Sequence, residues 1–217
     1  MSDLRLTGYH LSVYTRAARM ALVAKGVAYG NEEIDPFDEA CAVRLRGLHP
    51  FGRVPVLEHG GFRLYETQAI LDYVDGAFDG PGLVPDAPQA RARMRQVMGI
   101  ADCYLYWPLV RQVFSHRVFR PLIGADTDEA VVDAGLGKAG PVLDALEEIA
   151  GEGLALVPGE MRLETCLLWP MLDYFRMAPQ GAEMLAARRA LSDWADWAGT
   201  LGAARETRPN LPEGEET

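Results

Sequence analysis

The sequence is poor in cysteine, has no long apolar run and carries no surplus of positive charge, and each feature excludes a class of protein. The 217 residues include three cysteines, at positions 41, 103 and 166. Their odd number, wide spacing and lack of a CxxC pair argue against a disulfide framework, a zinc site or a dithiol redox centre. The net charge of −10 disfavours a general nucleic-acid binder, because such proteins need a basic face to displace counterions from phosphates.

Membrane and secretion signals are also missing. The longest apolar runs, such as 166–172, are far shorter than the about 20 residues that span a bilayer. Residues 1–5 lack the basic and then apolar pattern of a signal peptide. From these two features we expect a cytoplasmic protein with no membrane partner. Because 49% of the residues are hydrophobic, the chain can form an ordinary globular core.

A stretch rich in glycine and proline at 78–88 separates two parts of different texture. Before it, strand and helix periodicities alternate, which predicts an α/β domain over 1–78 with the order βαβαββα. Beyond a linker at 79–88, only helical periodicity continues, which predicts an all-α bundle over 89–217. The expected strands are 4–7, 27–33, 54–58 and 62–65, and the expected helices are 15–25, 39–48, 67–77, 88–119, 128–151, 163–176 and 181–201.

The first expected strand runs into the first expected helix through residues 9–14, and this junction contains Ser12. A helix start presents unpaired backbone N–H groups and the positive end of the helix dipole, which favours an anion. A serine hydroxyl there could donate a hydrogen bond to a thiolate and lower the thiol pKa below the free-cysteine value of about 8.5. The alternative is that Ser12 only caps the helix, because serine is a preferred N-cap residue.

Two further segments have features of a peptide-binding site. Pro55 interrupts the strand expected at 54–58, where it cannot donate to a sheet. A cis bond before Pro55, although rarer than trans, would turn the N–H and C=O of Val54 outward to pair with an extended peptide. Glu66 and Thr67 begin the helix expected at 67–77, whose start can hold a carboxylate while Glu66 takes an ammonium group. Here too the alternative is a plain helix cap.

In order and spacing these segments resemble the N-terminal domain of the cytosolic glutathione transferases, in a serine-type, bacterial-like form. The family pattern is Ser, Tyr or Cys after the first strand, then Arg-hydrophobic-Ala-Leu, then Asn-Pro-x-Gly-x-Val-Pro-x-Leu, then Glu-Ser-x-Ala-Ile. The matching residues here are Ser12, 19–22, 49–57 and 66–70. His49 replaces the usual asparagine, Thr67 replaces the usual serine, and Tyr9 is one residue away from the tyrosine-type position.

The resemblance implies a thioredoxin-like first domain and an all-α second domain, with glutathione as co-substrate, no tightly bound cofactor and no metal. It also implies a role for each matching residue. Ser12 would activate the thiol, and Val54, beside a cis Pro55, would hold the cysteinyl backbone. Glu66 and Thr67 would hold the γ-glutamyl end, and Arg53 would lie near the glycyl carboxylate.

The helical half resembles the family less closely. Residues 162–165 replace a Ser-Leu-Ala-Asp capping box, so we expect the helix near Leu163 to begin loosely or to be capped by another group. The expected second-substrate pocket comprises Leu11, Tyr104, Trp107 and His116. The alternative is that most of the aromatic side chains of Tyr104, Tyr106, Trp107 and Phe114, on the helix expected at 88–119, are core and that His116 is a surface or satisfied histidine.

The resemblance implies a glutathione transferase that presents the thiolate to a small, hydrophobic electrophile, as in detoxification. One alternative is a glutathione-dependent isomerase, dehalogenase or peroxidase on the same fold. The isomerase option is weakened because residues 11–13 read Leu-Ser-Val instead of Ser-Ser-Cys. Another alternative is a transferase-like regulatory protein without catalysis. Relatives are homodimers, and the expected interface comprises 68–75 and 91–98.

Overall fold

The computed structural model describes residues 3–212, which form two compact units. The first unit comprises the chain up to Leu83 together with Gly202–Asn210, so a C-terminal segment returns to the N-terminal part. The second unit comprises Val84–Leu201 and, beyond the first unit's C-terminal segment, residues 211–212. Each unit has its own buried apolar core.

A four-stranded sheet of order β2-β1-β3-β4 forms the centre of the first unit. β1 pairs in parallel with β2 and antiparallel with β3, and β3 pairs antiparallel with β4. Gly60 and Gly61 form the β3–β4 turn at φ 55° and 83°, values that suit a two-residue hairpin in which both central residues need positive φ. The strands are β1 (Leu4–Gly8), β2 (Gly30–Glu33), β3 (Val56–His59) and β4 (Phe62–Tyr65).

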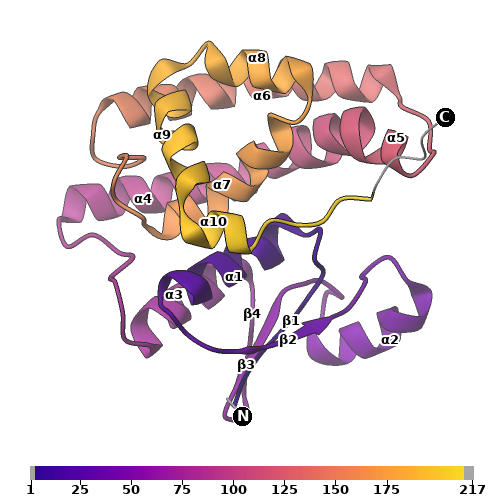
Figure 1. Ribbon diagram of the computed structural model, residues 1–217, viewed down its shortest axis with the longest axis vertical. Coiled ribbons are helices and arrows are strands. Elements are labelled where there is room, and N and C mark those ends of the chain that lie inside the picture. Colours follow the sequence, from indigo (N-terminus) through magenta and orange to yellow (C-terminus); the bar gives the residue numbers. More distant parts are fainter. Residues whose placement is uncertain (1–2, 213–217) are drawn as a thin grey trace. The chain divides into compact units, whose positions relative to one another are not determined.

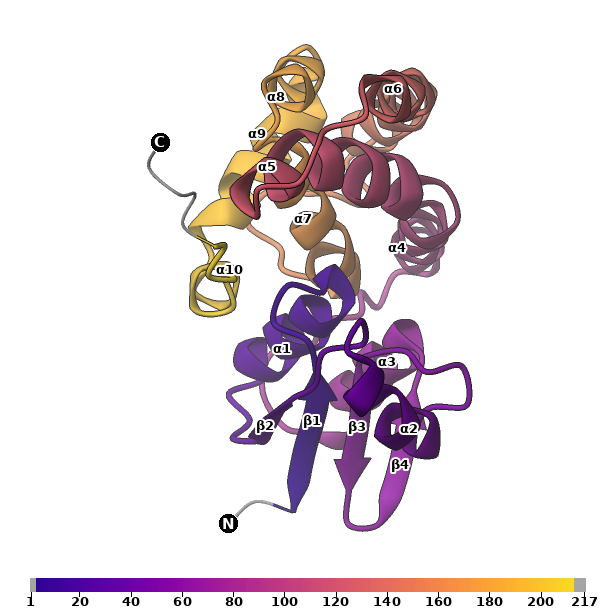
Figure 2. The same ribbon diagram turned by 90° about the vertical axis from the view of Figure 1, so that its right-hand side faces the viewer.

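Three longer helices and one short one accompany this sheet. α1 and α3 lie together on one face, whereas α2 lies on the other (Figure 1, Figure 2). The buried face of α1 is rich in alanine, and these small side chains allow a close approach to its neighbours. Arg16 of α1 donates from Nη2 to the backbone oxygen of Ala204 at 3.1 Å, which ties α10 to α1. The helices are α1 (Val13–Ala24), α2 (Glu39–Leu48), α3 (Thr67–Ala77) and α10 (Gly202–Glu206).

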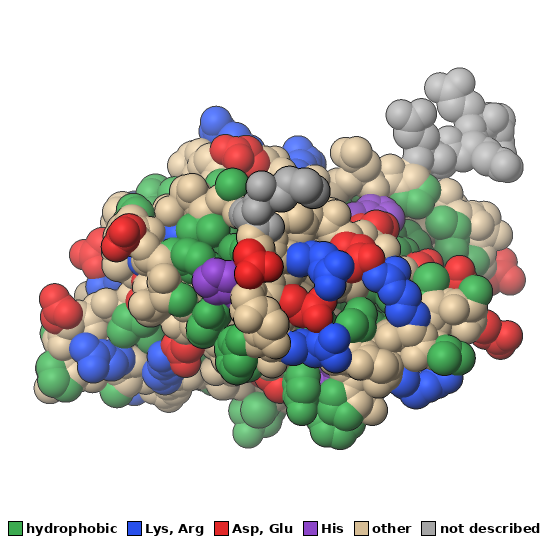
Figure 3. Space-filling view, turned by 90° about the horizontal axis from the view of Figure 1, so that it is seen from below, with side chains coloured by type: hydrophobic (Ala, Val, Ile, Leu, Met, Phe, Trp, Pro, Cys, Tyr) green, Lys and Arg blue, Asp and Glu red, His purple; other side chains and the backbone are tan. Residues whose placement is uncertain are grey.

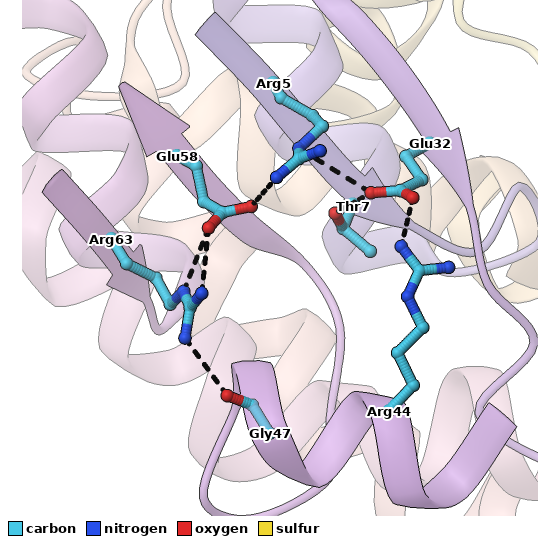
Figure 4. A network of polar contacts seen from close by, with 7 residues as sticks. All are labelled: Arg5, Thr7, Glu32, Arg44, Gly47, Glu58 and Arg63. Atoms are coloured by element: carbon cyan, nitrogen blue, oxygen red, sulfur yellow. Dashed lines mark hydrogen bonds and ion pairs between the residues drawn. The ribbon is translucent and has the colours of Figure 1, made fainter. Parts of the chain in front are cut away.

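α2 is attached to the sheet mainly through charged side chains. Of its ten residues, all within the described part of the chain, only Leu45 is buried. On the face drawn in Figure 3, acidic and basic side chains lie beside one another instead of in separate patches. Figure 4 shows one such network, in which Arg44 of α2 pairs with Glu32 of β2 and Arg63 of β4 donates to the backbone oxygen of Gly47 at 3.0 Å.

The second unit is a bundle of helices around α7. All 13 residues of α7 are buried, the polar Glu164, Thr165 and Asp173 among them, so the helix is enclosed on every side. Phe114 of η1 stacks on Tyr174 of α7 with ring centroids 3.9 Å apart. The elements are α4 (Pro88–Ile100), the π-helix η1 (Ala101–Phe119), α5 (Arg120–Leu122), α6 (Glu129–Gly151), α7 (Leu163–Phe175), α8 (Pro179–Ala186) and α9 (Arg189–Thr200).

The fold class predicted from the sequence is confirmed, and the differences lie within the elements. β3 begins at Val56, after Pro55, because proline cannot donate to the ladder. The helix expected at 181–201 is two helices, since Arg188 has the extended angles φ −118° and ψ 90°. α10 was not predicted. In residues 3–212, no helix combines the length and apolarity that crossing a bilayer requires.

The start of α7 is closed by groups other than the serine and aspartate of the family box. The Thr165 hydroxyl oxygen accepts the Arg162 N–H at 3.3 Å, which supplies one half of a capping box. The Arg162 guanidinium donates to the backbone oxygen of Leu154 at 2.7 Å and pairs with Glu160. Of the two expected alternatives, a loose start or a cap by another group, the structure therefore shows the cap.

Candidate functional site

Ser12 lies in the turn between β1 and α1. Its N–H donates to the backbone oxygen of Tyr9 at 2.9 Å, and its φ and ψ of −76° and 122° are those of an N-cap residue. The Ser12 hydroxyl oxygen accepts the N–H of Thr15 at 3.2 Å, so Ser12 caps α1. A hydroxyl has two acceptor lone pairs and one O–H donor. Because the cap uses an acceptor lone pair, it leaves the O–H available to donate to another group.

A close approach between β1 and α1 fixes the position of this turn. A Cβ atom on Gly8 would lie 2.3 Å from Cγ2 of Thr15, so only glycine fits at the end of the strand. Thr15 is buried, and its hydroxyl oxygen accepts the N–H of Tyr9 at 3.3 Å. Thr15 therefore packs against the end of β1 and binds the turn at two points, Tyr9 and Ser12.

Tyr9 carries the other hydroxyl group of this turn, and its pKa is raised above the ordinary value. Burial raises the Tyr9 pKa, and the charges of Asp35 and Glu33 raise it further. Its ring packs edge-on against the rings of His10 and Phe37. A phenol with a raised pKa is not ionised near pH 7, so Tyr9 would not serve as a base there.

The segment before β3 has the predicted proline geometry. The Val54–Pro55 peptide bond is cis. Pro55 is buried and Val54 is half-buried. The first paired residue of β3 is Val56, so Val54 precedes the ladder that joins β3 to β1 and β4. Arg53, one residue earlier, is exposed.

Glu66 is the N-cap residue of α3 and has an unusual backbone. Its φ of 70° and ψ of 116° are rare for a residue other than glycine. Such conformations cost about 1–3 kcal/mol and gather at functional sites. The Glu66 side chain is 64% exposed, whereas Thr67 at the first position of the helix is buried. The strain therefore holds an exposed carboxylate at the start of a helix.

His49 joins these two segments, and its departure from the family pattern was the only sign of it in the sequence. Its side chain is 3% exposed, and its Nδ1 accepts the N–H of Phe51 at 3.1 Å. Its Nε2 lies 3.9 Å from Oε1 of Glu66, and its ring packs on that of Tyr65 at 4.6 Å. Burial lowers the pKa of His49, the Glu66 carboxylate works against this, and Arg53 lowers the pKa further.

The residues expected around the second substrate have varied surroundings. Leu11, half-buried, belongs to the first unit. Tyr104 and Trp107 of η1 are 63% and 59% exposed, so the core alternative is wrong for these two. His116 accepts the N–H of Asp128 on Nδ1 at 3.2 Å, which links η1 to the start of α6. Within residues 3–212, no three His, Cys, Asp or Glu side chains are grouped to hold a metal ion.

Comparisons with known proteins agree with the resemblance in the sequence. The family model described as "Glutathione S-transferase, N-terminal domain" matches residues 6–82. Glutathione S-transferase F10 of Arabidopsis thaliana is 26% identical over 196 residues, covering 88% of this chain and 90% of the relative. Glutathione S-transferase F9 of the same plant is 27% identical over 208 residues, covering 94% and 95%.

Solved structures show the same fold. The apo form of glutathione S-transferase III superposes with a TM-score of 0.83 at 24% identity and full coverage of both chains. A theta-class enzyme of Xanthomonas axonopodis pv. citri, with glutathione bound, gives a TM-score of 0.78 at 23% identity, covering 97% and 99%. The two relatives are from a plant and the theta-class structure is from Xanthomonas, so the finer prediction of a bacterial-like member is not supported. The family model identifies residues 6–82 as similar to a glutathione S-transferase N-terminal domain, and the plant glutathione S-transferases resemble the chain over most of its length.

Proposed function

We propose that the protein is a glutathione transferase that uses Ser12 to keep the thiol of bound glutathione ionised. The observation that carries the proposal is the geometry of Ser12, whose oxygen caps α1 through an acceptor lone pair and leaves its O–H free to donate. The sulfur would lie at the N-terminus of α1, where the helix dipole favours negative charge. The match of residues 6–82 to the glutathione S-transferase N-terminal domain supports glutathione as the ligand.

A single hydrogen bond from Ser12 is strong enough to lower the thiol pKa by the amount that the proposal needs. A hydrogen bond to a charged group contributes about 1.5–3 kcal/mol, and one pKa unit corresponds to about 1.4 kcal/mol. One such bond therefore lowers the thiol pKa by one to two units. A fall from about 8.5 to about 7.5 raises the thiolate fraction at pH 7 from about 3% to about 24%. Holding the thiolate beside the electrophile supplies the rest of the acceleration.

Glutathione would bind along the residues that the family motifs match. Its cysteinyl backbone would pair with the N–H and C=O of Val54, beside the cis Pro55. Its γ-glutamyl carboxylate would accept hydrogen bonds at the start of α3 from Thr67, and its ammonium group would meet the exposed carboxylate of Glu66. Arg53 would face the glycyl carboxylate. Glutathione is consumed in the reaction, so no resident cofactor is needed.

The co-substrate would be a small, hydrophobic electrophile. The sulfur lone pair forms the new S–C bond, and the leaving group departs with its bonding electrons or, in an addition, the product takes up a proton. Leu11, Tyr104 and Trp107 would line the pocket, and His116 has the weakest support because its Nδ1 already binds Asp128. A cytoplasmic homodimer through 68–75 and 91–98 completes the proposal.

Replacing Ser12 tests this function, because it removes the donor. For Ser12→Ala we expect the kinetic pKa of conjugation with an aryl halide to rise by one to two units. We also expect a loss of about tenfold per unit in kcat/KM below that pKa, together with loss of the bound-thiolate ultraviolet absorbance. Removal of the cap alone costs about 1 kcal/mol of stability.

The matched control is Asp128→Ala. Asp128 caps α6 by accepting the N–H of Val131 at 3.2 Å, so this variant loses a cap of the same kind without the proposed donor. It should lose comparable stability and keep its pH profile. If Ser12→Ala keeps the pH profile and the thiolate absorbance of the unmodified protein, the assigned role of Ser12 is wrong. Absence of any turnover would instead favour the regulatory alternative.

A further inference from the structure

His49 occupies a place from which it can act on both glutathione-binding segments. It is the C-cap residue of α2, it accepts a hydrogen bond from the turn that leads to Val54, and it faces Glu66 at the start of α3. Its Nδ1 accepts the N–H of Phe51, so Nδ1 carries no proton. In a neutral imidazole the proton is then on Nε2, the nitrogen 3.9 Å from the Glu66 carboxylate. At that separation a direct hydrogen bond is too long, but one bridging water or charge–dipole attraction is available.

We propose that neutral His49 is a positioning residue for glutathione, which holds the Phe51 turn through Nδ1 and orients the Glu66 carboxylate through Nε2–H. This inference rests on the proposed function, since Val54 and Glu66 are the groups that would hold the tripeptide. His49 makes no contact with the thiol in this scheme. Its effect is on binding, through the two segments that it joins.

Protonation of the ring would undo this arrangement. An imidazolium carries a proton on both nitrogens, so Nδ1–H would point at the N–H of Phe51 and the turn would lose its acceptor. The charged and titratable groups that face the ring are Glu66 from α3, Arg53 from the preceding loop and the phenol of Tyr65 from β4. Burial and Arg53 favour the neutral ring, and Glu66 opposes them.

The direction of the pH effect follows from this balance. Since the pKa of His49 lies below its ordinary value of 6.5, the ring is neutral at pH 7 and becomes charged only as the solution is acidified. Affinity for glutathione should therefore be constant from pH 7 to 8 and fall below the His49 pKa, by up to about tenfold per pH unit. In steady-state kinetics the effect should appear in the KM for glutathione, with kcat at saturation unchanged.

The test measures binding of S-methylglutathione by calorimetry between pH 5 and 8. Its sulfur is alkylated, so its binding does not depend on thiol ionisation or on the donor role of Ser12. His49→Asn keeps a short acceptor for the Phe51 N–H and does not titrate, so it should bind as the unmodified protein does at pH 7 and lose the acid weakening. His49→Phe keeps a ring against Tyr65 without an acceptor, so it should bind about tenfold more weakly across the whole range.

His10→Asn is the control, because His10 is an exposed histidine of the same unit, paired with Glu33. It should keep the acid weakening. Circular dichroism and thermal unfolding check that each variant is folded. The inference is overturned if the unmodified protein binds S-methylglutathione with no pH dependence, if His49→Asn keeps the acid weakening, or if folded His49→Phe binds normally. If the unmodified protein binds none at any pH, the proposed function itself fails.

Discussion

Glu164 gives the sharpest test of how burial acts on a charge in this protein. The residue lies in the first turn of α7 and is 1% exposed. Within the described chain, its Oε2 has no hydrogen-bond partner. Burial raises the Glu164 pKa to about 7, against the opposing effects of the backbone N–H groups of Glu164 and Leu156 and of the Arg162 charge. The folded protein therefore holds this proton more tightly than the unfolded chain does.

The size of the effect follows from the two pKa values. The ordinary value is 4.5 and the folded value is about 7. The difference of about 2.5 units corresponds to about 3 kcal/mol of stability that is present below pH 4.5 and lost as the pH rises through 7. Between pH 5.5 and pH 8, the part of this change that can be measured is about 2 kcal/mol. Glu164→Gln cannot ionise, so it should lack the change.

Urea unfolding at several pH values measures this quantity. All four tryptophans, at positions 107, 169, 194 and 197, lie in the second unit, so their fluorescence follows the unit that contains Glu164. The free energy of unfolding of Glu164→Gln minus that of the unmodified protein should rise by about 2 kcal/mol from pH 5.5 to pH 8. Glu183→Gln, at an exposed position of α8, is the control for the amide substitution. A difference that stays constant with pH for Glu164→Gln would refute the reasoning.

Two further predictions concern the first unit. Lys25→Ala should lower the free energy of unfolding by about 3 kcal/mol, because the buried Lys25 Nζ binds Asp75 at 3.2 Å and the backbone oxygen of Pro81 at 3.1 Å. Denaturation measures this loss, and limited proteolysis near 79–83 shows whether the segment has loosened. If this segment resists proteolysis in Lys25→Ala as well as it does in the unmodified protein, the Lys25–Asp75 pair does not hold the segment in place. Gly8→Ala should cost about 1–3 kcal/mol, since its Cβ would meet Thr15 at 2.3 Å, and Thr15→Ser should recover part of the loss in thermal unfolding. An unchanged melting temperature for Gly8→Ala would contradict the packing argument.

The sequence was sufficient where the determining interactions are local. Alternation and helical spacing predicted every strand of the first unit and its order of elements, because each pattern records which face is buried. The second unit was predicted less closely. Pro108 lies inside η1, and the N–H of Arg120 reaches back to the oxygen of Ser115, five residues earlier. The spacing of apolar residues does not distinguish such a π-helix from an α-helix, and no turn residues in the sequence mark the change from one to the other.

The candidate site divides in the same way. Ser12, Val54–Pro55 and Glu66–Thr67 were found because helix starts and an interrupting proline are visible within a few residues. His49 and Glu164 were not, since their properties depend on burial by segments distant in the sequence. His49 lies near Glu66, which is 17 positions away in the sequence, and the Glu164 pKa is raised by the packing around α7. A departure from the family pattern at residue 49 was the one available signal.

The two interpretations of Ser12 competed in the sequence because a cap and a thiol activator both require a serine at a helix start. In the structure a single hydroxyl can meet both requirements. The bond from the Thr15 N–H fixes the Ser12 oxygen and occupies one of its lone pairs. The O–H is thereby confined to the remaining directions around that oxygen. If Ser12 activates the thiol as we propose, the cap also aims the donor, and a residue that lengthens or removes the cap should disturb ionisation of the thiol along with the stability of α1.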